Sequence, residues 1–391
     1  MPRAGGRVRE ALGRPVTRME RALGNLAPEE DQFLRWPDGR INGMFDSVPE
    51  PAPHFAGPLL AGRAHVLAGL GGTSKTRFLY SLAAGAVLGT LPWSWQVHRT
   101  GSAALFLTED TVADVHATVH ELGKSLSAED RKLLTQRLRV YALAGRSMRL
   151  LAASGTALHE ADAYDWLMRQ LDAMPKPLVF VGLDPALALT EGDELNQAHQ
   201  RRLGELVDQI AIETGACVLL TAHAAKGLQQ AEELGSHAAR GGGALTDAVR
   251  GELVMRTMTA DEARCFQIDD IVERKRHVQL ALTKANHCPP EAFAPIWLKR
   301  GSAGLLSEVT LEQVERGSVG DREQRALDLL RKANGSGETA FRFWQAECEA
   351  AGLIAQGSEG SREKAMQRIK SALLAAGMVA KGSSRGMWIP A

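Results

Sequence analysis

Continuous apolar runs alternate with amphipathic stretches through the first two thirds of this chain. A continuous apolar run is typical of a strand buried on both faces of a parallel sheet. Apolar residues that recur every three or four positions predict a helix that packs on the sheet. The predicted strands are residues 65–68, 103–108, 138–142, 178–183 and 216–222. The predicted helices follow Thr76 and span 111–124, 128–137, 157–173 and 197–213. This alternation predicts an α/β domain with a mostly parallel sheet.

The remaining pattern sets the domain boundaries. Strand-like runs predict antiparallel additions at the sheet edge, at 251–258, 264–270 and 277–283. Three helical patterns and two short strands then come in the order typical of a winged helix, with the helices at 322–333, 339–351 and 361–376. We therefore divide the chain into a flexible Arg- and Pro-rich segment 1–57, an α/β domain 58–308, a linker 309–320 and a winged-helix domain 321–391.

A glycine-rich turn, GLGGTSKT at residues 69–76, joins the first predicted strand to its helix. This layout is typical of a phosphate-binding loop, whose backbone N–H groups point at phosphate oxygens. Lys75 would neutralise the β- and γ-phosphates, and the Thr76 hydroxyl would ligate Mg²⁺. The alternative is a turn that binds nothing, but Lys75 and Thr76 stand where a triphosphate requires them. The predicted nucleotide-binding residues are Gly69, Leu70, Gly71, Gly72, Thr73, Ser74, Lys75, Thr76 and Arg77.

Ser74 departs from the usual loop pattern, which has glycine at this position. If the residue must be left-handed, serine costs about 1–2 kcal/mol more than glycine. Its hydroxyl could instead donate to a phosphate.

Three polar residues end the predicted parallel strands. Glu109 follows the second strand, Asp184 closes the fourth and His223 closes the fifth. Ligands bind along this edge in open α/β sheets, and a strand ending in Asp suits the second Mg²⁺ ligand beside Thr76. The alternative for His223 is a purely structural role, as a core histidine with its hydrogen bonds made inside the protein. Its place at a strand tip favours a role in the site.

Composition limits the other possibilities. The formal net charge is zero, so evidence for nucleic-acid binding must be local. The four cysteines are far apart without a C-x-x-C pair, which argues against zinc or a disulfide framework and for a reducing cytoplasm. No apolar stretch approaches the ~18 residues needed to span a bilayer. Six arginines before residue 27 are expected to belong to a solvated tail.

The order of these motifs resembles RecA-like ring ATPases of the AAA-type P-loop class, and among them the RepA-type hexameric helicases of plasmids and phages. The resemblance covers residues 58–308. It depends on six segments, which are GLGGTSKT, FLTED at 106–110, VFVGLDP at 179–185, LLTAHAAKG at 219–227, ARGGGALTDAVR at 239–250 and LTKANHCPP at 282–290.

The resemblance implies a RecA-like fold, ATP and Mg²⁺ as cofactors, and a role for each matched residue. Glu109 would orient the attacking water, Asp184 would be the Walker B aspartate, and His223 would sense the γ-phosphate. Arg250 would be the arginine finger that reaches a neighbouring subunit, with Arg240 as its rival. The related DnaB-like helicases carry a Lys-x-Arg pair where this chain has Lys284 and Asn286, so only Lys284 could act there.

The resemblance also implies partners. These are single-stranded DNA, further copies in a homo-hexamer, and an initiator or primase. Loops 186–196 and 224–243 would line a channel and hold the strand by its phosphates. Residues 361–391 lie outside the resemblance but carry six basic side chains against one acid, so a basic helix face of the winged helix would contact DNA, or would be a solvated face of a protein-binding wing. The predicted DNA-binding residues are Arg240, Arg362, Lys364, Arg368 and Lys370.

Three functions remain open from the sequence. The first is an ATP-driven helicase, the second is a DNA-binding ATPase that switches or loads partners, and the third is a degenerate ATP-binding module. Arg250 and Lys284 being present argues against the third. Strand displacement with ATP would separate the first two.

Overall fold

The computed structural model describes residues 45, 48–49, 51–155, 157–224, 243–268, 270–312, 320–334, 338–354, 357–383 and 386–390. The described residues form two compact units, within Met1–Thr259 plus Asp270–Thr310 and within Ala260–Asp269 plus Leu311–Ala391. Most of the expected N-terminal segment, of the linker and of the 224–243 loop lies outside the described residues, as does Arg240.

A nine-stranded sheet forms the centre of the first unit, in the order β13-β12-β11-β10-β3-β9-β8-β4-β5. Strands β10, β3, β9, β8, β4 and β5 are parallel. Beyond β10, strands β11, β12 and β13 follow in turn, each antiparallel to the strand before it. The strands are β3 (Ala64–Gly69), β4 (Ser102–Leu107), β5 (Leu138–Ala142), β8 (Leu178–Asp184), β9 (Cys217–His223), β10 (Gly251–Thr257), β11 (His277–Ala285), β12 (Ile296–Arg300) and β13 (Leu306–Glu308). The prediction of an α/β fold with a mostly parallel sheet is confirmed.

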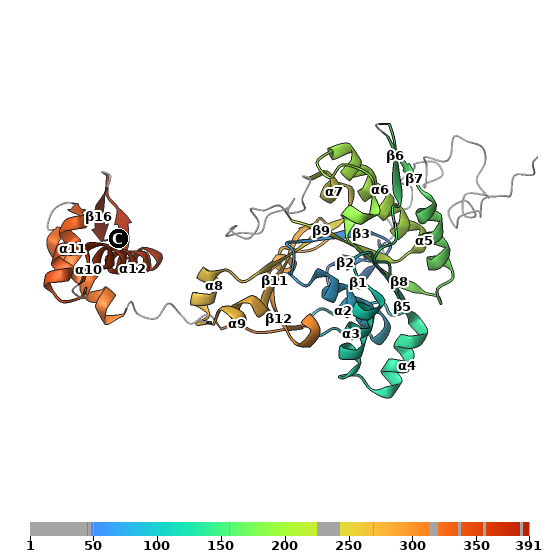
Figure 1. Cartoon of the computed structure of the whole chain (residues 1–391), viewed down its shortest axis with the longest axis horizontal. Helices are drawn as coiled ribbons and strands as arrows, with labels where there is room; N and C mark the ends of the chain where they lie inside the picture. Colours follow the sequence, from blue (N-terminus) through green and yellow to red (C-terminus); the bar gives the residue numbers. More distant parts are fainter. Residues whose placement is uncertain are drawn as a thin grey trace, which may run out of the picture. The chain divides into compact units, whose positions relative to one another are not determined.

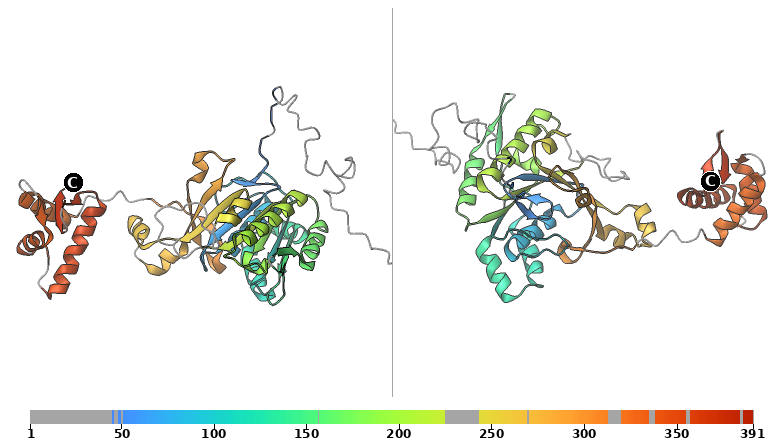
Figure 2. Two further views of the ribbon diagram at one scale, coloured as in Figure 1. Left: turned by 90° about the horizontal axis from the view of Figure 1, so that it is seen from above. Right: turned by 180° about the vertical axis from the view of Figure 1, so that it is seen from behind.

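Helices cover both faces of this sheet (Figures 1 and 2). The first-unit helices are α2 (Lys75–Leu88), α3 (Val112–Gly123), α4 (Ala128–Arg137), α5 (Asp162–Asp172), α6 (Gln197–Thr214), α7 (Gly243–Ala248) and α9 (Ile271–Arg276). Side chains of α2, α3 and α4 pack into one core cluster, and those of α5, α6 and α7 pack into another. Successive β3 residues alternate between the two clusters, as Val66 and Leu67 do. Burial on both faces therefore explains the continuous apolar runs.

Three local predictions are wrong. Residues 264–270 contain no strand in their described part, because Ala260–Cys265 forms helix α8, with acids in its first turn and Arg264 in its last. Strand β10 pairs in parallel with β3, so it belongs to the parallel part of the sheet. The predicted helix 157–173 begins late, because β6 (Leu151–Ser154) and β7 (Ala157–Glu160) form a hairpin with Gly155 at φ 63°. Strand alternation competes with helical spacing over so short a stretch.

A small hairpin lies at the start of β3. Its strands β1 (His54–Ala56) and β2 (Leu59–Leu60) pair antiparallel.

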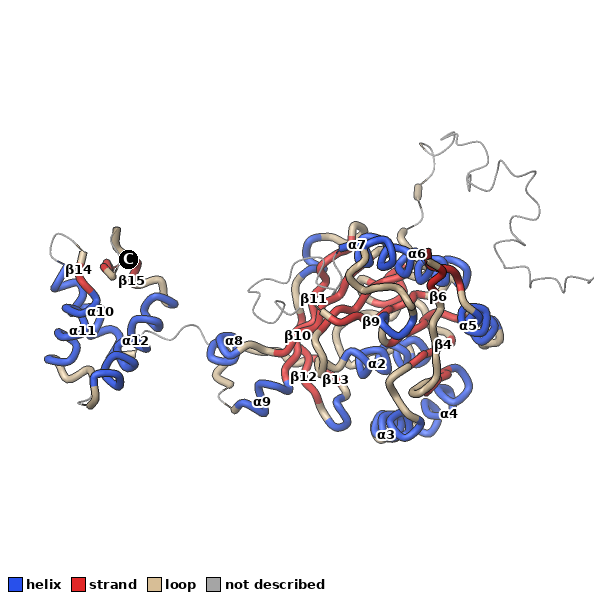
Figure 3. The backbone as a smooth tube through the Cα atoms, turned by 45° about the horizontal axis from the view of Figure 1, so that its top comes forward, coloured by secondary structure: helices blue, strands red, loops and turns tan. Residues whose placement is uncertain are grey.

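The tube in Figure 3 shows how helices in blue surround the red strands of the first unit. Among the described helices, none combines the length and the apolar composition that crossing a bilayer would require.

The second unit has its own core. Its elements are α10 (Asp321–Asn334), β14 (Thr339–Ala340), α11 (Phe341–Ala350), α12 (Glu359–Ala375), β15 (Val379–Lys381) and β16 (Met387–Pro390). The three strands form one sheet in the order β14-β16-β15. Trp344 is fully buried at the centre, and its indole N–H donates to the Ala326 carbonyl at 2.8 Å.

Candidate nucleotide-binding site

The loop between β3 and α2 has the geometry of an anion cradle. Gly72 and Ser74 have φ values of 75° and 69°, which turn the chain sharply before the helix begins at Lys75. A Cβ at Gly69 would lie 2.7 Å from the Thr73 hydroxyl oxygen, so only glycine fits there. At Gly71 and Gly72 a Cβ would meet nothing within 4 Å. The loop is therefore packed on its inner side and open on the side where backbone amides can meet phosphate.

Lys75 is buried beneath this loop. Its Nζ donates to the carbonyls of Gly69 at 2.8 Å and Leu70 at 3.1 Å. Burial lowers the pKa of Lys75, and the carboxylates of Asp184 and then Glu109 act in the opposite direction. Both acids therefore lie within electrostatic reach of the lysine. An arriving phosphate would take over the hydrogen bonds that the two carbonyls now accept.

Asp184 joins the loop to the neighbouring strand tips. Its carboxylate accepts from the Thr76 hydroxyl at 2.5 Å, and its other oxygen accepts a short hydrogen bond from the Thr221 hydroxyl. Hydroxyl and carboxylate oxygens are the ligands that Mg²⁺ takes from a protein when phosphates and water supply the others. The described residues hold no cluster of three or more His, Cys, Asp or Glu side chains that could bind a metal unaided. The donor set therefore fits Mg²⁺ held jointly with a nucleotide.

Glu109 and Asp110 leave the tip of β4 in different environments. Glu109 is exposed, whereas burial raises the pKa of Asp110 against the opposing effect of Arg77. The Arg77 guanidinium lies 3.6 Å from the Asp110 carboxylate, and its Nε donates to the Ala303 carbonyl at 3.0 Å. Arg77 thus connects the start of α2 to the hairpin between β12 and β13.

His223 lies beside the cradle. In the parallel ladder it pairs with Gly69, the last residue of β3, and the next residue's N–H donates to the Gly69 carbonyl at 3.2 Å. Its ring is partly exposed and borders a cavity lined also by Leu187 and Gln200. A side chain here can respond to groups that bind the loop.

Arg250 and Lys284 lie at the other end of the sheet. The Arg250 N–H donates to the carbonyl of Ala64, the first residue of β3, whereas the cradle follows the last residue. The Arg250 side chain is exposed. Lys284 is held at the end of α7, where its Nζ donates to the carbonyls of Thr246 at 2.6 Å and Val249 at 3.2 Å.

The basic residues of α12 divide into two pairs. Arg362 donates to Glu349 at 2.8 Å, and the Lys370 ammonium lies 5.0 and 5.1 Å from the ring centres of Phe341 and Trp388. Lys364 and Arg368 are exposed, one helical turn apart. These two are available to a partner, while the first two stabilise the second unit itself.

Sequence reasoning missed Thr221, Asp110 and the hairpin loop at Ala303. Thr221 lies two residues before His223, so the period of a strand puts both on one face, and this signal was readable. The contact between Arg77 and Ala303 joins positions more than two hundred residues apart, and no local pattern could indicate it.

A comparison with known families matches residues 28–229, just over half of the chain, to the model described as AAA domain. The chain belongs to the AAA domain family. The matched region contains the cradle, both site carboxylates and His223. Membership in this family of P-loop ATPases implies nucleotide binding, typically with Mg²⁺. Arg250 and Lys284 lie outside the match, so their roles stay predictions.

Proposed function

We propose that this AAA-domain protein is an ATP-hydrolysing, ring-forming DNA motor of the RepA-like helicase type. It would hydrolyse ATP at the interfaces of a homo-hexamer during plasmid- or phage-type replication. The observation that carries the proposal is the position of Arg250 at one end of β3, with the cradle at the other. Along a strand at about 3.3 Å per residue, these ends are roughly 16 Å apart.

This separation bears on assembly. Because this distance keeps Arg250 away from the nucleotide of its own subunit, Arg250 can complete only the site of another copy. Contact between opposite edges of two copies is a head-to-tail interface, which generates a ring when the rotation closes. An arginine supplied in this way is worth about 10³–10⁵ in rate.

Within one subunit each residue has a distinct task. The cradle amides and Lys75 bind the β- and γ-phosphates, while Glu109 orients a water in line with the γ-phosphorus. Thr76 and Asp184 would hold Mg²⁺, which when bound supplies positive charge at the phosphate oxygens. His223 beside Gly69 would register whether the γ-phosphate is present. Neutralisation of the developing charge is completed by Arg250 of a neighbouring copy.

One observation favours the second candidate, a DNA-binding switch or loader. Residues 186–196, expected to hold single-stranded DNA, carry Glu191, Asp193 and Glu194 and no cation. Residues 186–189 also form a short 3-10 helix, and Leu150 and Glu191 tie the segment to the β6 region by backbone hydrogen bonds. Acidic side chains repel phosphates, so this segment by itself does not supply the expected contact. DNA contact by Lys364 and Arg368, in what we propose is a winged helix, serves either candidate.

The test combines mass measurement with strand displacement. The motor requires a larger assembly with ATP and single-stranded DNA, together with ATP-dependent displacement of a paired strand. DNA-stimulated hydrolysis without displacement would favour the loader. Hydrolysis at full rate by the isolated monomer would contradict a shared site.

A further inference from the structure

A row of imidazoles lies beside Arg250 at the end of the sheet opposite the cradle. The ring centre of His54 is 5.5 Å from that of His287 and 6.0 Å from that of His98. His54 begins β1, His98 lies between α2 and β4, and His287 follows β11, so three segments far apart in the sequence build the row. Electrostatic effects of both His54 and Arg250 reach His287.

Hydrogen bonds fix two of these rings. His54 Nδ1 donates to the Gly57 carbonyl, and His287 Nε2 donates to the Pro58 carbonyl, each at 2.9 Å. A carbonyl can only accept, so these nitrogens carry hydrogen in the neutral rings. The opposite nitrogens, His54 Nε2 and His287 Nδ1, are the ones left to take up a proton.

A neutral histidine lies beneath the row. His65 is fully buried under it, and its Nε2 accepts from the Leu60 N–H at 3.2 Å. Burial lowers the pKa of His65 to about 3, so this ring stays neutral. A Cβ at Gly251, next to Arg250, would lie 2.7 Å from the His65 ring. The backbone that carries Arg250 therefore packs directly on the His65 ring.

Three carboxylates of the elements near the row have partners within the subunit. Asp208 accepts from Arg63 at 2.6 Å and from the Ala64 N–H at 2.9 Å. Glu252 is buried, where the hydroxyls of Thr246 and Thr283 donate to it at 2.9 and 2.8 Å. Asp247 lies 3.8 Å from the Lys284 ammonium. Among the described residues, the remaining ionisable groups on these elements are Arg99, Arg250, Cys288 and the exposed Glu291, which lies in the short turn after His287.

Charge thus favours an anion over this surface. Burial lowers the pKa of the His287 imidazole against the opposing effect of its hydrogen bond to the Pro58 carbonyl, and the nearby His54 and Arg250 lower it further. His287 is therefore largely neutral near pH 7, until a negative group approaches. Protonated imidazoles beside Arg250 would present several adjacent positive charges to that group.

We propose that His54, His98 and His287, together with Arg250, form the surface that docks on the nucleotide-bearing edge of a second copy, and that the imidazoles take up protons on docking. The proposal rests on the proposed function and adds the chemistry of the interface. The occupant is a bound triphosphate beside the exposed Glu109, which supplies the complementary negative charge. The direction of the pH dependence follows from linkage. An imidazole whose pKa is higher in the docked state strengthens docking as the pH falls.

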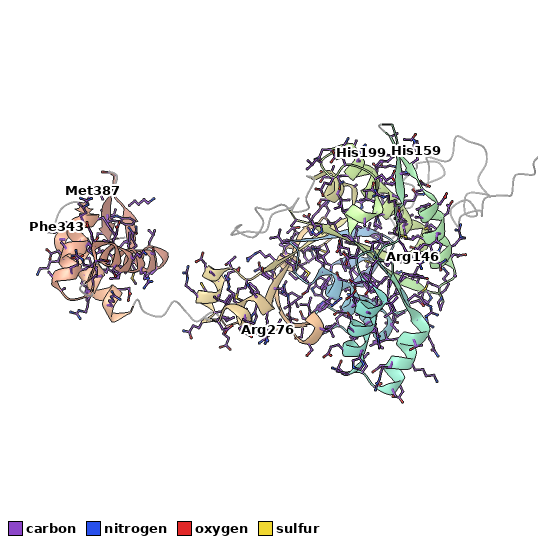
Figure 4. All side chains as sticks on the ribbon, viewed as in Figure 1. Arg146, His159, His199, Arg276, Phe343 and Met387 are labelled. Atoms are coloured by element: carbon purple, nitrogen blue, oxygen red, sulfur yellow. The ribbon has the colours of Figure 1, made fainter. Side chains whose placement is uncertain are left out.

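The experiment measures ATP-dependent assembly of the full chain by mass, between about pH 6 and about pH 8, the range in which imidazoles titrate. A His54→Gln/His287→Gln double variant removes the titrating groups but keeps side chains that can donate hydrogen bonds. The matched control is His159→Gln, on an exposed β7 imidazole in another part of the unit (Figure 4). Binding of a fluorescent ATP analogue is measured on the same samples.

Wild type and His159→Gln should assemble more weakly as pH rises, by up to about tenfold per pH unit for each proton taken up. The double variant should show a much flatter dependence. Assembly whose pH slope is unchanged in the double variant overturns this proposal and leaves the proposed function standing, whereas ATP binding without assembly at any pH overturns the ring on which both depend. If the double variant does not fold, the exposed His98→Gln must reduce the slope. Failure to bind the analogue at all would instead overturn the proposed function.

Discussion

Replacing Ser74 with glycine is predicted to stabilise the protein. Ser74 has a left-handed backbone, φ 69° and ψ 29°, immediately before α2. Its side chain makes no capping hydrogen bond to the helix. The structure therefore meets the condition under which serine at this position is strained.

The magnitude follows from two opposing terms. A left-handed residue other than glycine costs about 1–2 kcal/mol, and Ser74→Gly removes that cost. Glycine also makes the unfolded chain more flexible, which lowers the free energy of unfolding by about 0.4–1 kcal/mol. The net gain should be about 0.5–1 kcal/mol, which raises Tm by about 1–4 °C in a domain of this size.

Urea unfolding followed by tryptophan fluorescence measures this, because Trp93 stacks on Phe78 of α2 at 4.8 Å. The matched control is Ser81→Gly in the same helix, where the backbone is right-handed and the hydroxyl donates to the Arg77 carbonyl at 3.2 Å. This control should lose about 1 kcal/mol or more. Affinity for an ATP analogue should stay within about twofold for Ser74→Gly if its hydroxyl makes no phosphate contact. Lower stability, or a tenfold weaker affinity, would refute the strain argument and assign the hydroxyl a role in the loop.

Three other experiments test the sites. Lys75→Ala should abolish nucleotide binding, since it removes the one cation buried beneath the loop among the described residues, and unchanged affinity in a fluorescence titration would exclude the cradle. Asp184→Asn should remove the gain in nucleotide affinity that Mg²⁺ produces, and a Mg²⁺ titration showing the same gain would contradict the metal assignment. Replacing Lys364 and Arg368 with alanine should weaken DNA binding and reduce the salt slope by about 2, whereas Lys332→Ala on α10 should do neither. Equal effects from Lys332→Ala would locate the DNA contact elsewhere.

The central parallel strands β3, β4, β8 and β9 could be predicted from the sequence because each is buried on both faces. Burial on two sides demands an apolar residue at every position, and that signal needs no partner to be known. The loop was readable for a related reason, since Gly69 and the left-handed turn after it depend on local geometry. The carboxylates followed from the rule that ligands bind at the carboxyl ends of parallel strands.

The errors arose where short segments depend on distant partners. The β6–β7 hairpin has four residues in each strand, too few to separate from a helical pattern. The direction of β10 is set by its pairing with β3, nearly two hundred residues earlier. The state of the α12 cations was also hidden, because Lys370 is held by rings from α11 and β16.

The most direct test of a shared ATP site is complementation between two inactive variants. Arg250→Ala should bind ATP without hydrolysing it, and Glu109→Ala should fail because water is not oriented. In an equal mixture about a quarter of the head-to-tail interfaces combine an intact Glu109 with an intact Arg250 from the next copy. The mixture should therefore recover about a quarter of wild-type turnover, and turnover no higher than that of either variant alone would contradict the shared site.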